Sequence, residues 1–197
     1  MVLTLHSLLS HSDGIVPIYN DEVLAVSLKI MQENSKLHKN SRPSFKDMNT
    51  LIAQSVLSVF FPAANTPQSK LSLWSPSANS LSNVLSTLCP NPAYKFLQLR
   101  SIPQCDKRTR DYNADLWNEL LQRMRQMVVS NSSEHLVNWT PQTLVKSLGN
   151  LLVLRGDKVY DERPTLETDV FKCQVTGVRD SHRLFGNQKS VGLLSNN

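Results

Sequence analysis

The stretch between Pro43 and Pro62 is the feature that most constrains how this chain can fold. Apolar residues recur there at steps of three and four, which predicts one long amphipathic helix: Phe45, Met48, Leu51, Ile52, Val56, Val59 and Phe60. Ser44 followed three residues later by Asp47 resembles a capping box, which marks a helix start. Because the apolar positions cover more than half of the circumference, we expect this helix to be buried in a core.

Helical spacing predicts further helices over residues 2–11, 20–31, 81–88 and 116–128. Asn20 is predicted to cap the second of them, with Asp21 and Glu22 in its first turn, where carboxylates complement the helix dipole. The polar runs 32–42 and 63–80 are typical of loops.

Short apolar runs predict strands between these helices. They cover residues 15–18, 94–102, 151–154, 171–175 and 191–194. The run over 151–154 is continuous, which is typical of a strand buried on both faces. Helices and strands mixed along one chain indicate the α/β class.

The six glycines argue against a self-contained nucleotide enzyme. No two of them lie within the few residues that a phosphate-cradling loop requires. The five histidines are dispersed, and no nucleophile and base stand in a recognisable pattern. From the residues alone we expect a chain that is not an enzyme and holds no metal.

Three cysteines at wide spacings indicate neither a disulfide framework nor a zinc knuckle, so a reducing compartment is expected. Neither a signal peptide nor a run of about 18 apolar residues is seen, so no membrane association is expected.

The net charge of +5 would suit an anionic partner. Lys107, Arg108 and Arg110 form the only dense basic run, which reads as a solvated loop. No aromatic residues of the kind that stack on bases accompany this run, so nucleic acid is not the expected partner. The alternative function is a basic interaction module that grips an anionic partner through residues 107–110.

A series of short segments carries a family resemblance that spans nearly the whole chain. In order they are Leu3-Thr4-Leu5-His6, His11-Ser12-Asp13, Asn20-Asp21-Glu22, residues 42–49, Cys89-Pro90-Asn91-Pro92, Ser101-Ile102-Pro103, and residues 120–131, 150–156 and 190–196. Together they resemble the central portion of tubulins. The helix that ends at Ser130-Asn131, together with Ile102-Pro103, points to the delta branch of that family.

The resemblance implies the middle of a tubulin-like α/β fold. Residues 1–62 would form the end of the nucleotide-binding domain with its long central helix, and 63–80 a loop. Residues 81–197 would form a truncated intermediate domain built on a mixed sheet. The glycine-rich phosphate loop of tubulins would lie before Met1, and their C-terminal helices after Asn197.

The resemblance also implies a site for the guanine of GTP. Phe45 stands where tubulins stack an aromatic ring on the base, and Asn20 and Asn49 match two asparagines that contact it. A ring and an amide at i and i+4 share one helix face. Read without the family, Phe45 would be a buried first-turn aromatic, Asn20 a cap and Asn49 a surface amide. Because charged phosphate contacts would be missing, base contacts alone should give roughly millimolar affinity.

The implied function is structural. Full-length relatives are guanine-nucleotide-binding cytoskeletal proteins of centrioles, basal bodies and cilia. The partners would be other tubulin-family subunits or centriolar proteins, in the cytoplasm, the centrosome and, as a further compartment, the nucleus. Alpha-type subunits supply a catalytic acid to a neighbour at a position where this chain has Asn83. An amide cannot act as a general base, so GTPase activity is not expected.

Overall fold

The computed structural model describes residues 2–33, 42–61, 81–104, 117–129, 148–156, 177–181 and 189–196. The helices are α1 (Val2–His11), α2 (Asn20–Glu33), α3 (Phe45–Phe60), α4 (Leu81–Leu88) and α5 (Trp117–Val129). The strands are β1 (Gln98–Ile102), β2 (Gly149–Arg155), β3 (Gly177–Ser181) and β4 (Ser190–Asn196). The α/β class expected from the sequence is therefore confirmed.

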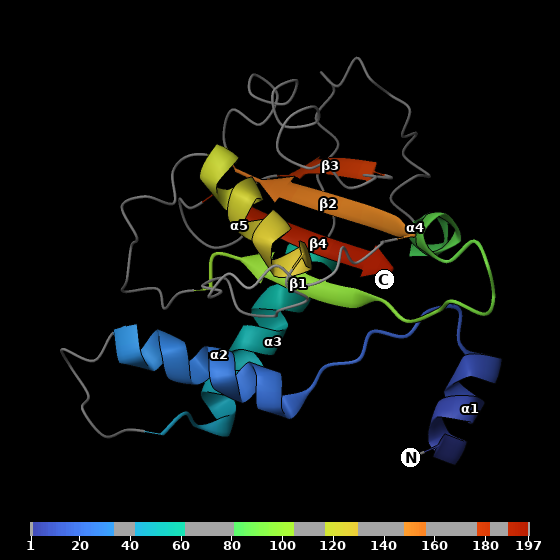
Figure 1. Ribbon diagram of the computed structural model, residues 1–197, viewed down its shortest axis with the longest axis horizontal. Helices are drawn as coiled ribbons and strands as arrows, with labels where there is room; N and C mark the ends of the chain where they lie inside the picture. The colour runs from blue at the N-terminus through green and yellow to red at the C-terminus, as the bar shows by residue number, and fades with distance from the viewer. Residues whose placement is uncertain are drawn as a thin grey trace.

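The four strands form one mixed sheet in the order β1-β4-β2-β3 (Figure 1). Strand β4 pairs antiparallel with both β1 and β2, whereas β2 and β3 are parallel. Every residue of β2 and β4 is buried. Their apolar runs fit this position, because a strand covered on both faces needs no polar alternation.

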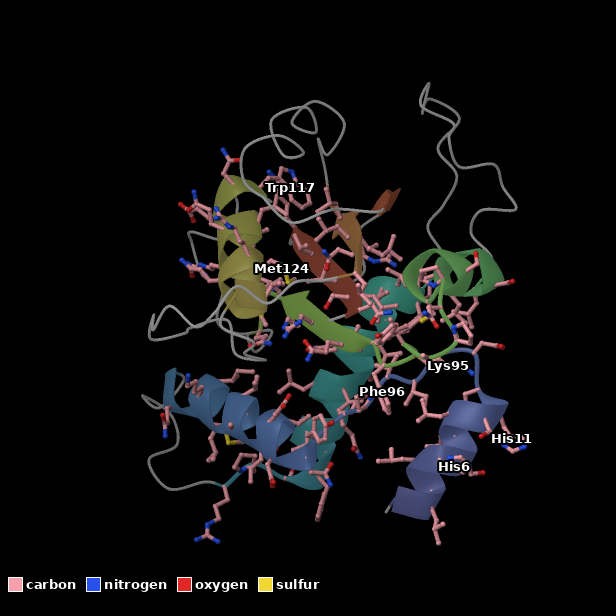
Figure 2. The ribbon with its side chains drawn as sticks, turned by 45° about the vertical axis from the view of Figure 1, so that its right-hand side comes forward. His6, His11, Lys95, Phe96, Trp117 and Met124 are labelled. Carbon is pink, nitrogen blue, oxygen red and sulfur yellow. The ribbon has the colours of Figure 1, made fainter. Side chains whose placement is uncertain are left out.

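Helix α5 covers one face of the sheet. Trp117 and Met124 point from this helix towards the strands (Figure 2), and both are almost fully buried. They share a core with residues from three strands: Ile102, Leu152, Leu154, Val191 and Leu193. The two methionines of α5 therefore fill a core, as their helical spacing predicts.

Helices α3 and α4 pack on the opposite face. Val59 of α3 and Leu88 of α4 form a second core with Leu97, which directly precedes β1, and with the strand residues Leu151, Val153 and Leu194. Alternate residues of a strand point to opposite faces, so β2 contributes to both cores.

The predicted start of α3 is confirmed at atomic level. The Asp47 amide donates to Ser44 Oγ at 3.3 Å, and the Ser44 amide donates to Asp47 Oδ2 at 2.9 Å. These two bonds form the complete capping box. The hydrogen bonds from Ser44 hold the pKa of the Asp47 carboxyl below its usual value, because they favour the charged form.

The expected burial of the whole of α3 is wrong. Only Met48, Ser58 and Val59 are buried, and Phe45 is 82% exposed. Val59 in the last turn of the helix packs into a core of the sheet, and α3 also contacts α2. A helix pattern shows which residues could be buried, and the neighbouring elements decide which of them are.

Three other expectations are corrected. Residues 15–18 do not form a strand, because only Ile15 bridges to Phe96 and Pro17 has no amide hydrogen to continue a ladder. The predicted strand over 94–102 begins only at Gln98. Asn20 is the first helical residue of α2, and the cap carbonyl is that of Tyr19, which accepts from the Val23 amide at 3.1 Å.

Two further predictions fall outside the described residues: the strand over 171–175 and the loop over 63–80. The predicted loop over 32–42 is corrected at its start, because Gln32 and Glu33 belong to α2, and residues 34–41 fall outside the described part of the chain. Strand β3 was not predicted. None of the helices in the described part of the chain is long and apolar enough to span a bilayer.

Candidate functional site

The three residues implied by the family resemblance lie on the first turns of two helices. Asn20 opens α2, and Phe45 and Asn49 occupy the first turns of α3. All three are exposed. The reading of Phe45 as a buried first-turn aromatic is therefore wrong, since its ring is open to a ligand.

Helices α2 and α3 contact each other, so the candidate residues sit on adjoining elements (Figure 1). Phe45 and Asn49 are four residues apart and share one face of α3. The structure thus combines an open aromatic ring with a nearby amide. A flat π surface beside donor and acceptor groups suits a purine base.

The electrostatics around these first turns are unfavourable to phosphate. The capping box places the Asp47 carboxylate at the start of α3 and bonds it to the Ser44 amide and hydroxyl. Asp21 and Glu22 occupy the first turn of α2. Helix N-termini attract anions through their free amides, and here three carboxylates add negative charge beside those amides. The surroundings favour a neutral base over a charged phosphate.

A cavity of about 80 Å³, which no sequence pattern predicts, lies between α2, α3 and β1. Its lining includes Glu22, Ser55, Leu99 and Arg100, but none of the three candidate residues. Small-molecule pockets in proteins usually hold about 300–1,000 Å³. The cavity is therefore separate from the candidate base site and too small for a nucleotide.

Arg100 is the buried charged group of this cavity and is only 4% exposed. It donates to Gln98 Oε1 at 2.5 Å and to Ser195 Oγ at 3.3 Å. Burial lowers its pKa to about 10, and the charge of Glu22 opposes that shift. At neutral pH it stays a cation, with partners on β1 and β4.

Two other sequence predictions cannot be placed. The basic run of Lys107, Arg108 and Arg110 lies outside the described residues. So does the side chain of Asn83, although its backbone belongs to α4. Within the described part of the chain, no group of three or more His, Cys, Asp or Glu side chains could hold a metal ion.

Comparison with known proteins places this chain beside the tubulin delta chains. It is 30% identical to the tubulin delta chain of Canis lupus familiaris and 31% identical to that of Mus musculus, over 222 residues in each case. The protein of Homo sapiens is 29% identical over 224 residues. Each match covers 99% of this chain and 46–47% of the relative.

The chain therefore spans about half the length of the curated relatives that it matches. No protein-family model matches it. Across nearly all of its length this chain is similar to part of a tubulin delta chain, and its predicted resemblance to the delta branch of the tubulins is confirmed.

Proposed function

We propose that this chain is a structural, cytoskeletal protein of the tubulin type, corresponding to the central part of a delta-tubulin. The similarity to tubulin delta chains over 99% of the chain supports this role. The mixed sheet packed against a long helix agrees with the expected intermediate domain and central helix. In this proposal residues 1–62 end the nucleotide-binding domain, and residues 81–197 form the intermediate domain.

The partners that we propose are other tubulin-family subunits or centriolar proteins. The corresponding locations are the cytoplasm and cytoskeleton, at centrioles and the basal bodies of cilia. This part of the proposal depends on the family alone, because the chain spans about half of its relatives.

We further propose that Asn20, Phe45 and Asn49 contact the guanine base of GTP. The observation that supports this site is the 82% exposure of the Phe45 ring beside Asn49 on one helix face. Stacking of a base on an aromatic ring contributes about 1–3 kcal/mol. Because carboxylates surround these helix starts, the phosphates would add little, and the affinity of this chain should be about millimolar.

No enzymatic activity is proposed for this chain by itself. The described residues around Phe45 offer a ring and amides, but neither a positioned general base nor a phosphate-binding loop. GTP would serve as a bound ligand and not as a substrate that these residues hydrolyse.

The test is a titration of the isotope-labelled chain with guanosine, GTP and cytidine, followed by NMR. We expect guanosine and GTP to bind with similar, roughly millimolar affinity and to shift the signals of Phe45 and Asn49, whereas cytidine binds more weakly. Phe45→Ala should weaken guanosine binding about tenfold. Tyr94→Ala is the matched control, because Tyr94 is also an exposed aromatic, at 55%, on another segment.

Two results would contradict the base site. The first is equal guanosine affinity in the wild type and in Phe45→Ala. The second is binding of GTP far tighter than that of guanosine, because phosphate contacts would then dominate.

A further inference from the structure

The C-terminal end of α3 is poorly capped by its own sequence. The last four carbonyls of any helix lack intrahelical partners. The last turn of α3 contains no basic residue, and Phe61 follows it with extended backbone angles instead of the left-handed cap that glycine often supplies. The Phe61 amide donates to the Leu57 carbonyl at 3.1 Å. The other carbonyls at this end need donors from elsewhere in the chain.

Arg155, the last residue of β2, supplies donors to Ser58 in the last turn and to Phe61, which follows it. Its Nε donates to the Ser58 carbonyl at 2.8 Å, and its Nη2 donates to the Phe61 carbonyl at 2.6 Å. A longer contact of 3.5 Å joins Nη2 to the Leu57 carbonyl. The guanidinium carbon also lies 6.0 Å from the centre of the Phe61 ring. One side chain thus reaches the carbonyls that close α3 and the ring that follows it.

The charge of Arg155 matches this position. The residue is only 1% exposed, and burial lowers its pKa to about 10. It is therefore still a cation at neutral pH. The negative end of a helix dipole stabilises a cation within the last turn, which compensates part of the cost of burying the guanidinium.

A second contact fixes the same turn of α3 against the sheet. A Cβ placed on Gly192 of β4 would lie 2.7 Å from Ser58 Oγ and 2.8 Å from Val59 Cγ2. The helix can approach this strand so closely only because position 192 is a glycine. Arg155 and Gly192 therefore meet α3 at one turn, about 20 Å along the helix from Phe45 at 1.5 Å per residue.

We propose that Arg155 is the positioning residue that closes the last turn of α3 and seats it on the sheet. The role needs the guanidinium fork and not merely a positive charge, because Nε and Nη2 serve carbonyls of different residues. A lysine would bring one ammonium group to a site with several acceptors. The proposal does not depend on guanine binding, since it concerns the opposite end of the helix.

The experiment is hydrogen–deuterium exchange on the full chain, resolved for the two ends of α3. Arg155→Met and Arg155→Lys are compared with Arg42→Lys, in which an exposed arginine just before α3 is changed. We expect both Arg155 variants to accelerate amide exchange over residues 57–61 at least tenfold. Exchange over residues 45–51 should change less than twofold, and Arg42→Lys should match the wild type at both ends.

Two outcomes would overturn the proposal. Wild-type exchange at residues 57–61 in Arg155→Lys would show that charge alone is sufficient. An even acceleration along the whole of α3 would show a general loss of stability without local closure of the last turn. If Arg155→Met fails to fold, Arg155→Lys decides between these outcomes, because lysine keeps the charge and most of the side-chain volume.

Discussion

Two parts of the molecule, the sheet with α5 and the N-terminal helices (α1, α2 and the first turns of α3, called here the helical region), both carry apolar residues at regular spacings, but they bury them very differently. Leu120, Met124 and Leu193 in the first region are 0% exposed. Leu3 and Phe45 in the second are 85% and 82% exposed. An apolar pattern therefore gives a core only where a second layer covers it, as α5 covers the sheet.

The two regions also differ in the forces that hold them. Burial of one large apolar side chain contributes about 1.5–3 kcal/mol, so the sheet and α5 should carry most of the stability. Hydrogen bonds are prominent in the helical region. The capping box of α3 is local, whereas the bond from Lys95 Nζ to the Leu9 carbonyl at 2.7 Å joins residues that are 86 positions apart. In Figure 2, Lys95 and Phe96 lie on the segment beside α1. Individual bonds of this kind are worth about 0.5–1.5 kcal/mol.

The largest predicted effect contrasts a leucine from each region. Leu193→Ala should lower the free energy of unfolding by about 2–5 kcal/mol, because it leaves a cavity in a closed core. Leu3→Ala should change it by less than about 0.5 kcal/mol, since that side chain is 85% exposed. Urea denaturation followed by circular dichroism measures both. Equal decreases in the free energy of unfolding would show that α1 is as well buried as the sheet, which would contradict the difference between the two regions.

The next effect compares two glycines. Gly192→Ala should cost about 1–3 kcal/mol, because the new Cβ would lie 3.1 Å from the Ser58 backbone carbon as well as close to its side chain. Gly14→Ala should cost less, since its Cβ would meet mainly the end of the Leu85 side chain, Cδ2 at 2.6 Å, which can rotate away. The same denaturation curves measure both variants. A larger loss for Gly14→Ala would contradict the tight seating of α3 on β4.

A smaller effect concerns the cap of α3. Ser44→Ala should cost about 1 kcal/mol and should raise the pKa of Asp47, because hydrogen bonds from Ser44 lower it. A carboxyl with a lowered folded pKa stabilises the protein above its unfolded pKa, and this contribution is lost as the pH falls through the folded pKa. The decrease in the free energy of unfolding as the pH falls should therefore be smaller in Ser44→Ala than in the wild type. NMR titration of Asp47 measures the pKa, and an unchanged value would contradict the capping role.

The smallest effect is predicted for Lys95→Met, which removes the donor to the Leu9 carbonyl. We expect the free energy of unfolding to change by less than about 1 kcal/mol, while amide exchange in α1 accelerates. Lys46→Met is the control, because Lys46 is an exposed lysine on another helix. Equal rates of α1 amide exchange in both variants and in the wild type would show that the Lys95 hydrogen bond does not stabilise α1.

Much of the secondary structure could be predicted because its signals are local. The start of α3 depends on Ser44 and Asp47, which are three residues apart, and the capping box forms as predicted. The apolar runs of β2 and β4 predict buried strands for the same reason. The same reasoning wrongly predicted a strand over 15–18. An apolar run becomes a strand only when a neighbouring strand pairs with it along its whole length, and here only Ile15 forms a bridge.

The candidate site was only partly accessible to prediction. The positions of Asn20, Phe45 and Asn49 came from the family resemblance, and the structure adds that all three are exposed at helix starts. The cavity lined by Arg100 could not be predicted, because its walls come from α2, α3 and β1. No spacing along the chain links these residues.

The sequence alone therefore determined the helix and strand signals, because each depends on residues close together in the chain. It also determined the family resemblance, because the short segments that carry it follow one another in order along the chain. The tertiary structure decided the order of the strands, which half of α3 is buried, and the partner that closes its last turn. Arg155 meets the Ser58 carbonyl across a separation of 97 residues. Contacts of that range form only when the sheet and the helix are packed together, and no local pattern encodes them.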